Sequence, residues 1–118
     1  MYDMKNVLII LNDPPYGTER SYNGLRLAKA VSNEETHVTV FLLADAIACT
    51  RKGQKVPQGF YNIELMLKSI LRKGKVLICG TCMDARGMTD DDILEGAERS
   101  TMKVLAEHTL NADKVLVF

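Results

Sequence analysis

The sequence predicts an α/β fold in which helices cover both faces of a mainly parallel β-sheet. Short β-branched apolar segments alternate along the chain with segments whose apolar residues recur at helical spacing. The apolar segments are also nearly continuous, which is typical of strands that are buried on both faces. We therefore expect a three-layer α/β/α sandwich with four or five strands, flavodoxin-like in architecture, and a single domain over residues 1–118.

The composition is that of a globular protein and gives no sign of nucleic-acid or membrane binding. Hydrophobic residues make up 47% of the chain, and the 15 basic and 15 acidic residues cancel. No basic stripe indicates nucleic acid, and no apolar run reaches the roughly 20 residues of a membrane-spanning helix. The first residues lack the apolar core of a signal peptide. We therefore expect a cytoplasmic protein whose three cysteines are thiols.

Four apolar segments are the predicted strands, and each is bounded by polar or turn-forming residues. They cover residues 5–11, 36–43, 75–79 and 115–118. Residues 12–17 contain two prolines and a glycine, so the first strand should end there. The interval between residues 85 and 100 has room for one further short strand.

Three helices are predicted from apolar stripes and from capping residues. Thr18 is a plausible N-cap for the first helix, which should end near residues 32–33. Asn62 can cap the second helix, which has the clearest apolar stripe and should end with Gly74 at its C′ position. Ser100 or Thr101 can cap the last helix.

Two shorter turns and a polar loop complete the predicted architecture. Residues 44–49 can form a helical turn, and Thr89 with Asp92 matches a capping box at the start of another. Residues 50–59 are the most polar and breaker-rich segment of the chain, so we expect a mobile loop there.

The densest group of reactive side chains follows the strand at residues 75–79. Open parallel sheets bind ligands just beyond the carboxyl ends of their strands, where Cys79, Cys82 and Arg86 lie within eight residues. If the residues after Cys79 form a helical turn, free N–H groups would point at its sulfur and lower the thiol pKa. Arg86 could approach the same sulfur from one or two turns further on.

Each thiol also has an ordinary structural interpretation. Cys79 could end a buried strand as a small apolar side chain, and Cys82 could be an unreactive thiol in a turn. Their C-x-x-C spacing also serves redox dithiols and half of a zinc site. A thioredoxin-like motif follows the first strand rather than the third, and zinc would need a second pair of ligands. We expect a structural role for Cys49 and no metal or cofactor.

Further residues at predicted strand ends could line a crevice beside Cys79. Asp13, Tyr16 and Asp45 follow the first and second strands, although ordinary loop solvation explains them equally well. Gly80 favours exposure of the neighbouring sulfur, and Gly87 lies just beyond Arg86. Neither standard glycine-rich phosphate loop is present in the sequence, which disfavours nucleotide binding.

The order of these segments resembles the DsrE/DsrF-like family of small sulfur-handling proteins. The resemblance spans nearly the full length, from the first strand and residues 12–15 to residues 112–118. It implies an α/β/α sandwich that assembles as a homo-oligomer, either a trimer or a hexamer. Sulfur-relay members have a cysteine at the end of this strand, seven residues before an arginine and eight before a glycine. Cys79, Arg86 and Gly87 match that spacing.

The resemblance implies that Cys79 carries sulfane sulfur as a persulfide between a donor and an acceptor protein, which is a sulfurtransferase activity. Arg86 and local N–H groups would hold the anion, and Cys82 would resolve the persulfide as a disulfide. Two alternatives remain open. One is a non-catalytic oligomer that binds a small ligand or a partner at the crevice, and the other is a C-x-x-C thiol-redox protein.

Overall fold

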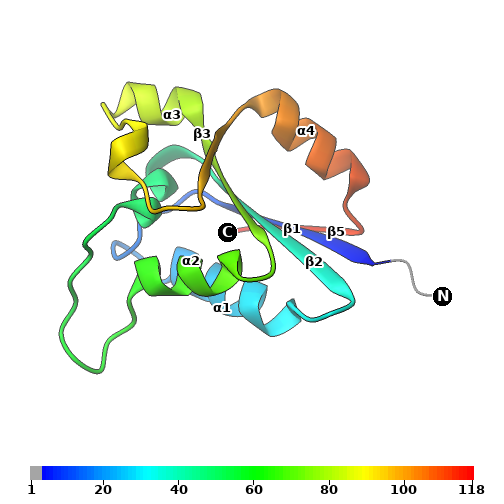
Figure 1. Ribbon diagram of the computed structural model, residues 1–118, viewed down its shortest axis with the longest axis horizontal. Coiled ribbons are helices and arrows are strands. Elements are labelled where there is room, and N and C mark those ends of the chain that lie inside the picture. Colours follow the sequence, from blue (N-terminus) through cyan, green and yellow to red (C-terminus); the bar gives the residue numbers. More distant parts are fainter. Residues whose placement is uncertain (1–3) are drawn as a thin grey trace.

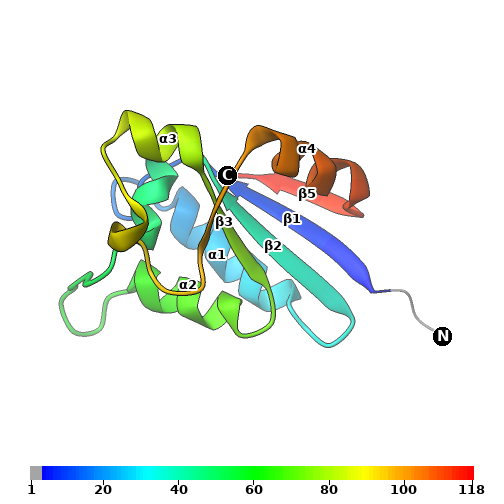
Figure 2. The same ribbon diagram turned by 45° about the horizontal axis from the view of Figure 1, so that its top comes forward.

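The computed structural model describes residues 4–118 and contains a five-stranded sheet in which all strands run parallel. The strands are β1 (Lys5–Leu11), β2 (Thr36–Leu42), β3 (Lys75–Cys79), β4 (Glu98–Ser100) and β5 (Lys114–Val117). Their order across the sheet is β4-β3-β2-β1-β5. Figure 2 shows β3, β2, β1 and β5 side by side in that order. The prediction of an α/β fold is confirmed, and β4 occupies the interval where a short fifth strand was expected.

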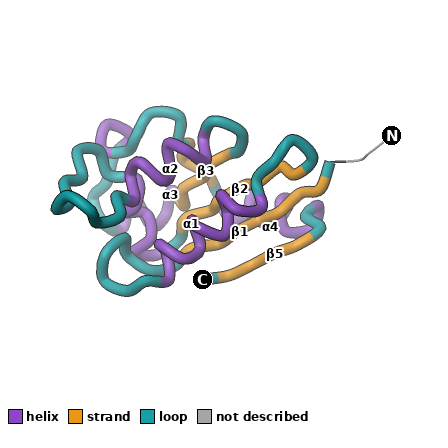
Figure 3. Tube along the Cα trace, turned by 90° about the horizontal axis from the view of Figure 1, so that it is seen from below, coloured by secondary structure: helices purple, strands orange, loops and turns teal. Residues whose placement is uncertain are grey.

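Helices cover both faces of this sheet. They are α1 (Arg20–Val31), α2 (Ile63–Leu71), α3 (Gly80–Ala85) and α4 (Met102–Asn111), with 3₁₀ turns η1 (Ala44–Thr50) and η2 (Asp90–Asp92). Figures 1 and 3 show α1 and α2 together on one face and α4 on the other. Within residues 4–118, no helix is both long and apolar enough to cross a membrane.

Strand side chains alternate between two cores of unequal size, because successive residues of a strand point to opposite faces. The larger core lies under α1 and α2 and contains Ile9, Val40 and Ile78. The smaller core lies under α4, and its buried members are Leu8, Phe41, Leu77, Cys79 and Leu105. Cys79 therefore belongs to the face that α4 covers.

Local capping signals predict most helix starts correctly. Asn62 accepts the Leu65 amide N–H at 3.1 Å, and Thr101 accepts that of Val104 at 3.2 Å. The capping box at Thr89 also forms. The prediction for Thr18 is wrong, because α1 begins at Arg20 without a side-chain cap. The Thr18 hydroxyl donates to Asp13 at 2.6 Å and accepts the Arg20 amide N–H at 3.3 Å, so it contacts the start of α1 from one residue before the N-cap, Glu19.

Gly74 follows α2 as expected but for a different physical reason. The Gly74 amide donates to the Ile70 carbonyl at 2.8 Å. Gly74 is not among the described glycines with positive φ, so it is not the left-handed C′ residue that we predicted. A Cβ at this position would instead collide with the carbonyl oxygen of Val38 on β2. The absence of a side chain here lets the chain turn tightly from α2 into β3.

Candidate active site

Cys79 ends β3 and is also the N-cap residue of α3. Its Sγ accepts the Cys82 amide N–H at 3.4 Å. The first N–H groups of a helix have no partner within the helix, so they are free to bond a capping atom. The expected helical turn after Cys79 is therefore present, with one N–H directed at the sulfur.

Cys79 is nevertheless buried, with only 7% of the residue exposed. It packs in the smaller core with Leu77 and Leu105. The Cys79 pKa lies above its ordinary value, mainly because burial penalises the thiolate and then because of a hydrogen bond with the Cys82 thiol. Backbone N–H groups of Cys82 and Thr81 oppose this shift. Cys79 is therefore a protected thiol in this conformation.

Cys82 is the more accessible of these two thiols, because it is only half-buried. Its Sγ accepts the Ala44 amide N–H at 3.2 Å. Ala44 has a φ of +51°, a left-handed conformation that costs a non-glycine residue free energy. Each sulfur of the C-x-x-C pair therefore accepts one backbone N–H, and the second of these donors comes from a strained residue.

Arg86 bonds to groups around the thiols. Its Nε donates to Asp45 Oδ1 at 3.0 Å, and its Nη1 donates to the Cys82 carbonyl at 3.2 Å. The predicted site residues Cys82, Asp45 and Arg86 are thus brought together. Among the described residues, the polar contacts of the Arg86 guanidinium are to oxygen atoms. Arg86 is therefore placed to hold the end of α3 against η1.

Arg99 is a second cation near Cys79, and the sequence reasoning missed it. Its guanidinium lies against Gly80, where a Cβ would be 2.9 Å from Nε and 3.1 Å from Cζ. Arg99 Nη2 is 2.7 Å from Asp84 Oδ2. Asp84 is the main cause of a raised Arg99 pKa, and a Cys79 thiolate acts in the same direction. This contact could have been anticipated only from the pairing of β4 with β3, which places Arg99 opposite Ile78.

The two glycines of the predicted site have different structural roles. Gly80 opens α3 and leaves the space in which the Arg99 guanidinium lies. Gly87 has a φ of +65° and open space around it, and its amide donates to the Asp84 carbonyl at 3.2 Å. Gly87 thus follows α3 in the left-handed conformation that glycine tolerates best, and it keeps this helix short.

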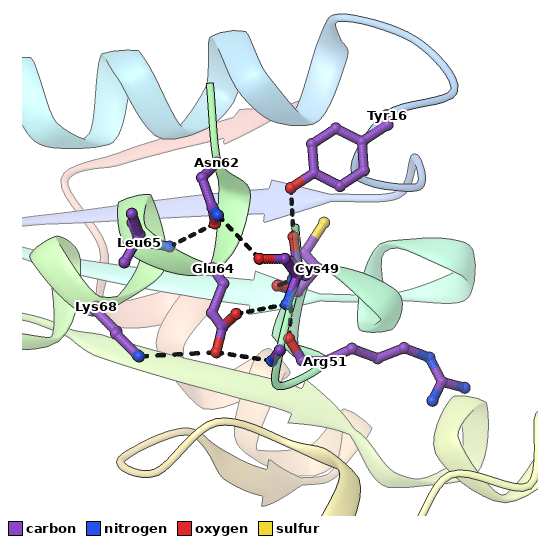
Figure 4. Close-up of polar contacts among 9 residues, drawn as sticks. Tyr16, Cys49, Arg51, Asn62, Glu64, Leu65 and Lys68 are labelled. Carbon is purple, nitrogen blue, oxygen red and sulfur yellow. Dashed lines mark hydrogen bonds and ion pairs between the residues drawn. The ribbon is translucent and has the colours of Figure 1, made fainter. Parts of the chain in front are cut away.

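Asp13 and Tyr16 lie in a separate polar cluster and make no described hydrogen bond to either thiol of the pair. The Asp13 carbonyl accepts the Ser21 hydroxyl at 2.6 Å and faces the Cys49 thiol at 3.9 Å. The Tyr16 hydroxyl donates to Gln54 Oε1 at 2.6 Å. Figure 4 shows Tyr16 directed toward the segment that contains Cys49. These contacts join the first loop to the segment after η1.

Cys49 is fully buried and is not a reactive thiol. Burial raises its pKa to about 12, an effect that hydrogen bonding with Ser21 only partly opposes. A thiolate is the nucleophilic form, so Cys49 is unreactive near neutral pH. The expected structural role of Cys49 agrees with this environment.

Glu64 anchors the polar loop that we expected to be mobile. Its carboxylate accepts the amide N–H groups of Gly53 at 3.2 Å and Gln54 at 2.8 Å (Figure 4). Lys68, one turn further along α2, lies 3.7 Å from the same carboxylate. Only 8% of Glu64 is exposed, so these are buried charge-assisted hydrogen bonds. The beginning of the loop is therefore fixed to α2.

Metal binding has no assembled ligand set within residues 4–118. That part of the chain contains no group of three or more His, Cys, Asp or Glu side chains that could hold a metal ion. The chemistry available beside Cys79 is consequently that of two neighbouring thiols, backbone N–H donors and two guanidinium groups.

Comparisons with known proteins agree with this architecture. The family model described as "DsrE/DsrF-like family" matches residues 5–118. Protein YchN of Escherichia coli (strain K12) is 40% identical over 118 residues, which cover 98% of this chain and 100% of YchN. The crystal structure of the E. coli ychN protein has a TM-score of 0.91, again covering 98% of this chain and 100% of that chain.

Archaeal proteins extend the comparison. The uncharacterized protein MK0008 of Methanopyrus kandleri is 33% identical over 112 residues, covering 95% of this chain and 93% of that protein. A protein of unknown function from Methanobacterium thermoautotrophicum, MTH1491, has a TM-score of 0.74 at 15% identity. The match covers 95% of this chain and 97% of MTH1491, and at this identity the likeness shows the fold alone.

Proposed function

The chain belongs to the DsrE/DsrF-like family, and from that premise we propose that it carries sulfane sulfur as a persulfide on Cys79. The observation that carries this proposal is the position of the Cys79 sulfur. It lies at the carboxyl end of β3, accepts a helical N–H from Cys82, and has the Arg99 guanidinium beside the next residue. An anionic sulfur at a helix N-terminus is stabilised by such donors.

The proposed reaction is two successive transfers of one sulfur atom. The Cys79 thiolate attacks the outer sulfur of a donor protein's persulfide, so a new S–S bond forms on Cys79. The donor's own S–S bond breaks, and the donor leaves as a thiolate. An acceptor thiolate then attacks the outer sulfur on Cys79, and Cys79 leaves as a thiolate. The sulfur moves without net oxidation or reduction.

Access to Cys79 depends on α3, because the sulfur is buried while Cys82 is half-exposed. In this proposal the donor displaces the Cys82 side chain and reaches the sulfur beneath it. Arg99 and the Cys82 amide would hold the persulfide anion. Arg86 would act as a positioning residue, through its bonds to Asp45 and to the Cys82 carbonyl.

The adjacency of the two thiols, in which the Cys82 amide N–H donates to the Cys79 sulfur, favours a second candidate, a thiol-redox function. In that reaction a partner's disulfide accepts two electrons and two protons from the pair. The Cys79–Cys82 disulfide forms as the partner's disulfide opens to two thiols. The same pair could also resolve a persulfide, with Cys82 releasing the outer sulfur as a sulfide.

Intact-mass measurement after incubation with a persulfide donor tests the proposal. We expect a one-sulfur adduct on the native chain and on Cys49→Ala, the matched control, because Cys49 is fully buried. The adduct should disappear in Cys79→Ser and last longer in Cys82→Ser. An adduct that survives in Cys79→Ser would refute the assignment. Loss of two hydrogens from the native chain, with no sulfur adduct on Cys82→Ser, would favour the redox candidate, and no change in either protein would favour a non-catalytic binding protein.

The proposal includes assembly as a homo-oligomer, a trimer or a hexamer, in the cytoplasm. Large apolar side chains are exposed on β5 and α4: Val117 is 64% exposed and Leu110 is 86% exposed. A reducing compartment would keep the thiols available for sulfur transfer. Light scattering should give the mass of a trimer or hexamer for the native chain and a lower mass for Val117→Asp. A monomeric native chain would remove this part of the proposal.

A further inference from the structure

A polar cavity lies at the amino ends of the strands, which is the end of the sheet opposite to Cys79. Its volume is about 250 Å³. It lies where the last turn of α4 passes over the start of β1 (Figure 1). The cavity is lined by Asn6, Val7, Leu8, His37, Thr39, Lys75, His108, Asn111 and Ala112. Six of these nine residues are polar or charged, which distinguishes this cavity from the cores on either side of the sheet.

The parallel register explains why these side chains converge. Asn6 of β1 pairs with His37 of β2, and Thr39 of β2 pairs with Lys75 of β3. Their neighbours in the chain, such as Val38, pack in the core under α1 and α2. Since successive strand residues alternate between faces, the four polar side chains point to the α4 face together. The last turns of α4 then add His108 and Asn111 from above.

The polar side chains of this cavity are not satisfied by one another. Across residues 4–118, none of the six makes a side-chain hydrogen bond or an ion pair with another described residue. Thr39 is only 3% exposed, and its hydroxyl, which still reaches the surface of the cavity, belongs to this set. These polar groups are therefore free to bond water or a ligand that enters the cavity.

The charges that face the cavity are cationic. Lys75 comes from β3, His37 from β2 and His108 from α4, and no lining residue is acidic. The nearby carboxylate of Asp113 accepts the backbone N–H of Asn6 at 2.7 Å. The His37 pKa is lowered, mainly by burial and then by the charges of Lys75 and His108. An anion among these groups would relieve their mutual repulsion.

We infer that this cavity binds a tetrahedral oxyanion, either free sulfate or phosphate or the terminal phosphate of a small ester, and that it binds more tightly at acid pH. Lys75 supplies a permanent charge, His37 supplies charge when it protonates, and the His108 ring, the Thr39 hydroxyl and two amides supply further hydrogen-bond donors. A metal ion fits less well, because two imidazoles give only two ligands and the Lys75 ammonium repels a cation.

Sulfate is the sharpest probe, because it keeps its two negative charges while the His37 imidazole titrates. We expect sulfate to shift the NMR signals of the His37 and His108 rings in the full-length protein. Binding should be about tenfold tighter at about pH 5.5 than at about pH 8, since protonation of His37 adds a positive charge to the cavity. Inorganic phosphate and glycerol phosphate, compared at one pH, would distinguish a free ion from an ester.

Matched variants separate the cavity from general surface charge. Lys75→Gln should weaken sulfate binding about tenfold, because it removes a charge-assisted contact. Lys103→Gln, on the same α4 but outside the cavity, should leave binding within about twofold. Thr39→Val keeps the buried shape and should also weaken binding.

Three results would overturn the inference: ring signals that sulfate leaves unmoved, an affinity that is equal at both pH values, or equal weakening by Lys75→Gln and Lys103→Gln. Zinc that shifts both rings where sulfate does not would also overturn it. Cys79 does not line this cavity, so the outcome is independent of the proposed sulfur transfer.

Discussion

The guanidinium of Arg99 lies against Gly80, the residue that follows Cys79, at a distance that leaves no room for a side chain. Asp84, which lies with Gly80 on the short helix α3, forms an ion pair with that guanidinium. β4 therefore supplies a cation beside the residue that follows Cys79. Arg86, which has the spacing typical of sulfur-relay relatives, is bonded to Asp45 and to the Cys82 carbonyl.

Gly80→Ala should displace the Arg99 guanidinium and make Cys79 less reactive. The new Cβ would lie 2.9 Å from Nε of a flexible side chain and 3.1 Å from the Ser100 carbonyl oxygen, so the guanidinium should move away with only a small shift of the backbone. Because the Arg99 side chain is near the surface, its effect on the sulfur is modest, and alkylation of Cys79 by iodoacetamide should slow by up to about fivefold. Arg99→Gln should slow it similarly, whereas Lys103→Gln should not. Unchanged alkylation in both site variants would mean that Arg99 does not act on the sulfur.

Ala44→Gly should stabilise the protein although it removes a methyl group. Ala44 has a φ of +51°, which costs a non-glycine residue about 1–2 kcal/mol. Glycine removes that strain but has a more flexible unfolded state, so we expect a net gain of about 0.5–1 kcal/mol. Urea denaturation measures it. The matched control is Ala106→Gly at an exposed position in the middle of α4, which should lower stability by about 1 kcal/mol. Equal destabilisation by both substitutions would contradict the strain at Ala44.

Glu64→Gln should loosen the start of the loop after η1. The variant keeps the shape of the side chain but loses the charge that accepts the Gly53 and Gln54 amides. Hydrogen bonds to a charged group contribute about 1.5–3 kcal/mol, so we expect destabilisation in that range at neutral pH. Hydrogen exchange at the Gly53 and Gln54 amides should also become faster in this variant. Glu107→Gln, on an exposed position of α4, should change neither quantity.

The native chain should lose stability in alkali partly through Cys49. Its pKa in the folded state is about 12, above the value of 9.0 for a free thiol. The unfolded chain therefore releases this proton first, and stability falls as the pH rises from about 9 to about 12. The full shift corresponds to about 4 kcal/mol. Cys49→Ala should show a shallower decline over that window, after correction for its lower starting stability. Parallel declines in the two proteins would show that Cys49 does not titrate in this way.

Local signals in the sequence account for the secondary structure. The continuous apolar run of β1 and the cap at Asn62 both depend on neighbours within a few residues, and both form as expected. Thr18 is not the N-cap because α1 begins one residue later than the pattern predicts, with Glu19 as its N-cap, although the Thr18 hydroxyl still accepts the Arg20 N–H. Gly74 was assigned the right place for the wrong reason, because the atom that excludes a side chain is on β2.

The candidate site was harder to predict, because it depends on which strands are neighbours. The helical turn after Cys79 is local and was anticipated, but Arg99 approaches only because β4 pairs with β3. Asp13 and Tyr16 were expected near Cys79 since all three follow strand ends. They pack instead around the segment of Cys49 and Gln54, on the α1 and α2 side of the sheet. A strand's end in the sequence does not tell which face its following loop will join.

The short length of α3 has a consequence for how the accessibility of the Cys79 thiol could be changed by substitution. The helix has six residues, stops before Gly87, and is held in the core mainly by Met83. Unwinding it would release the sulfur of Cys79 while the five strands stay paired, so the free energy of that local opening is separate from the free energy of global unfolding. Substitutions within α3 can therefore change how often the thiol meets its partners without changing the melting temperature.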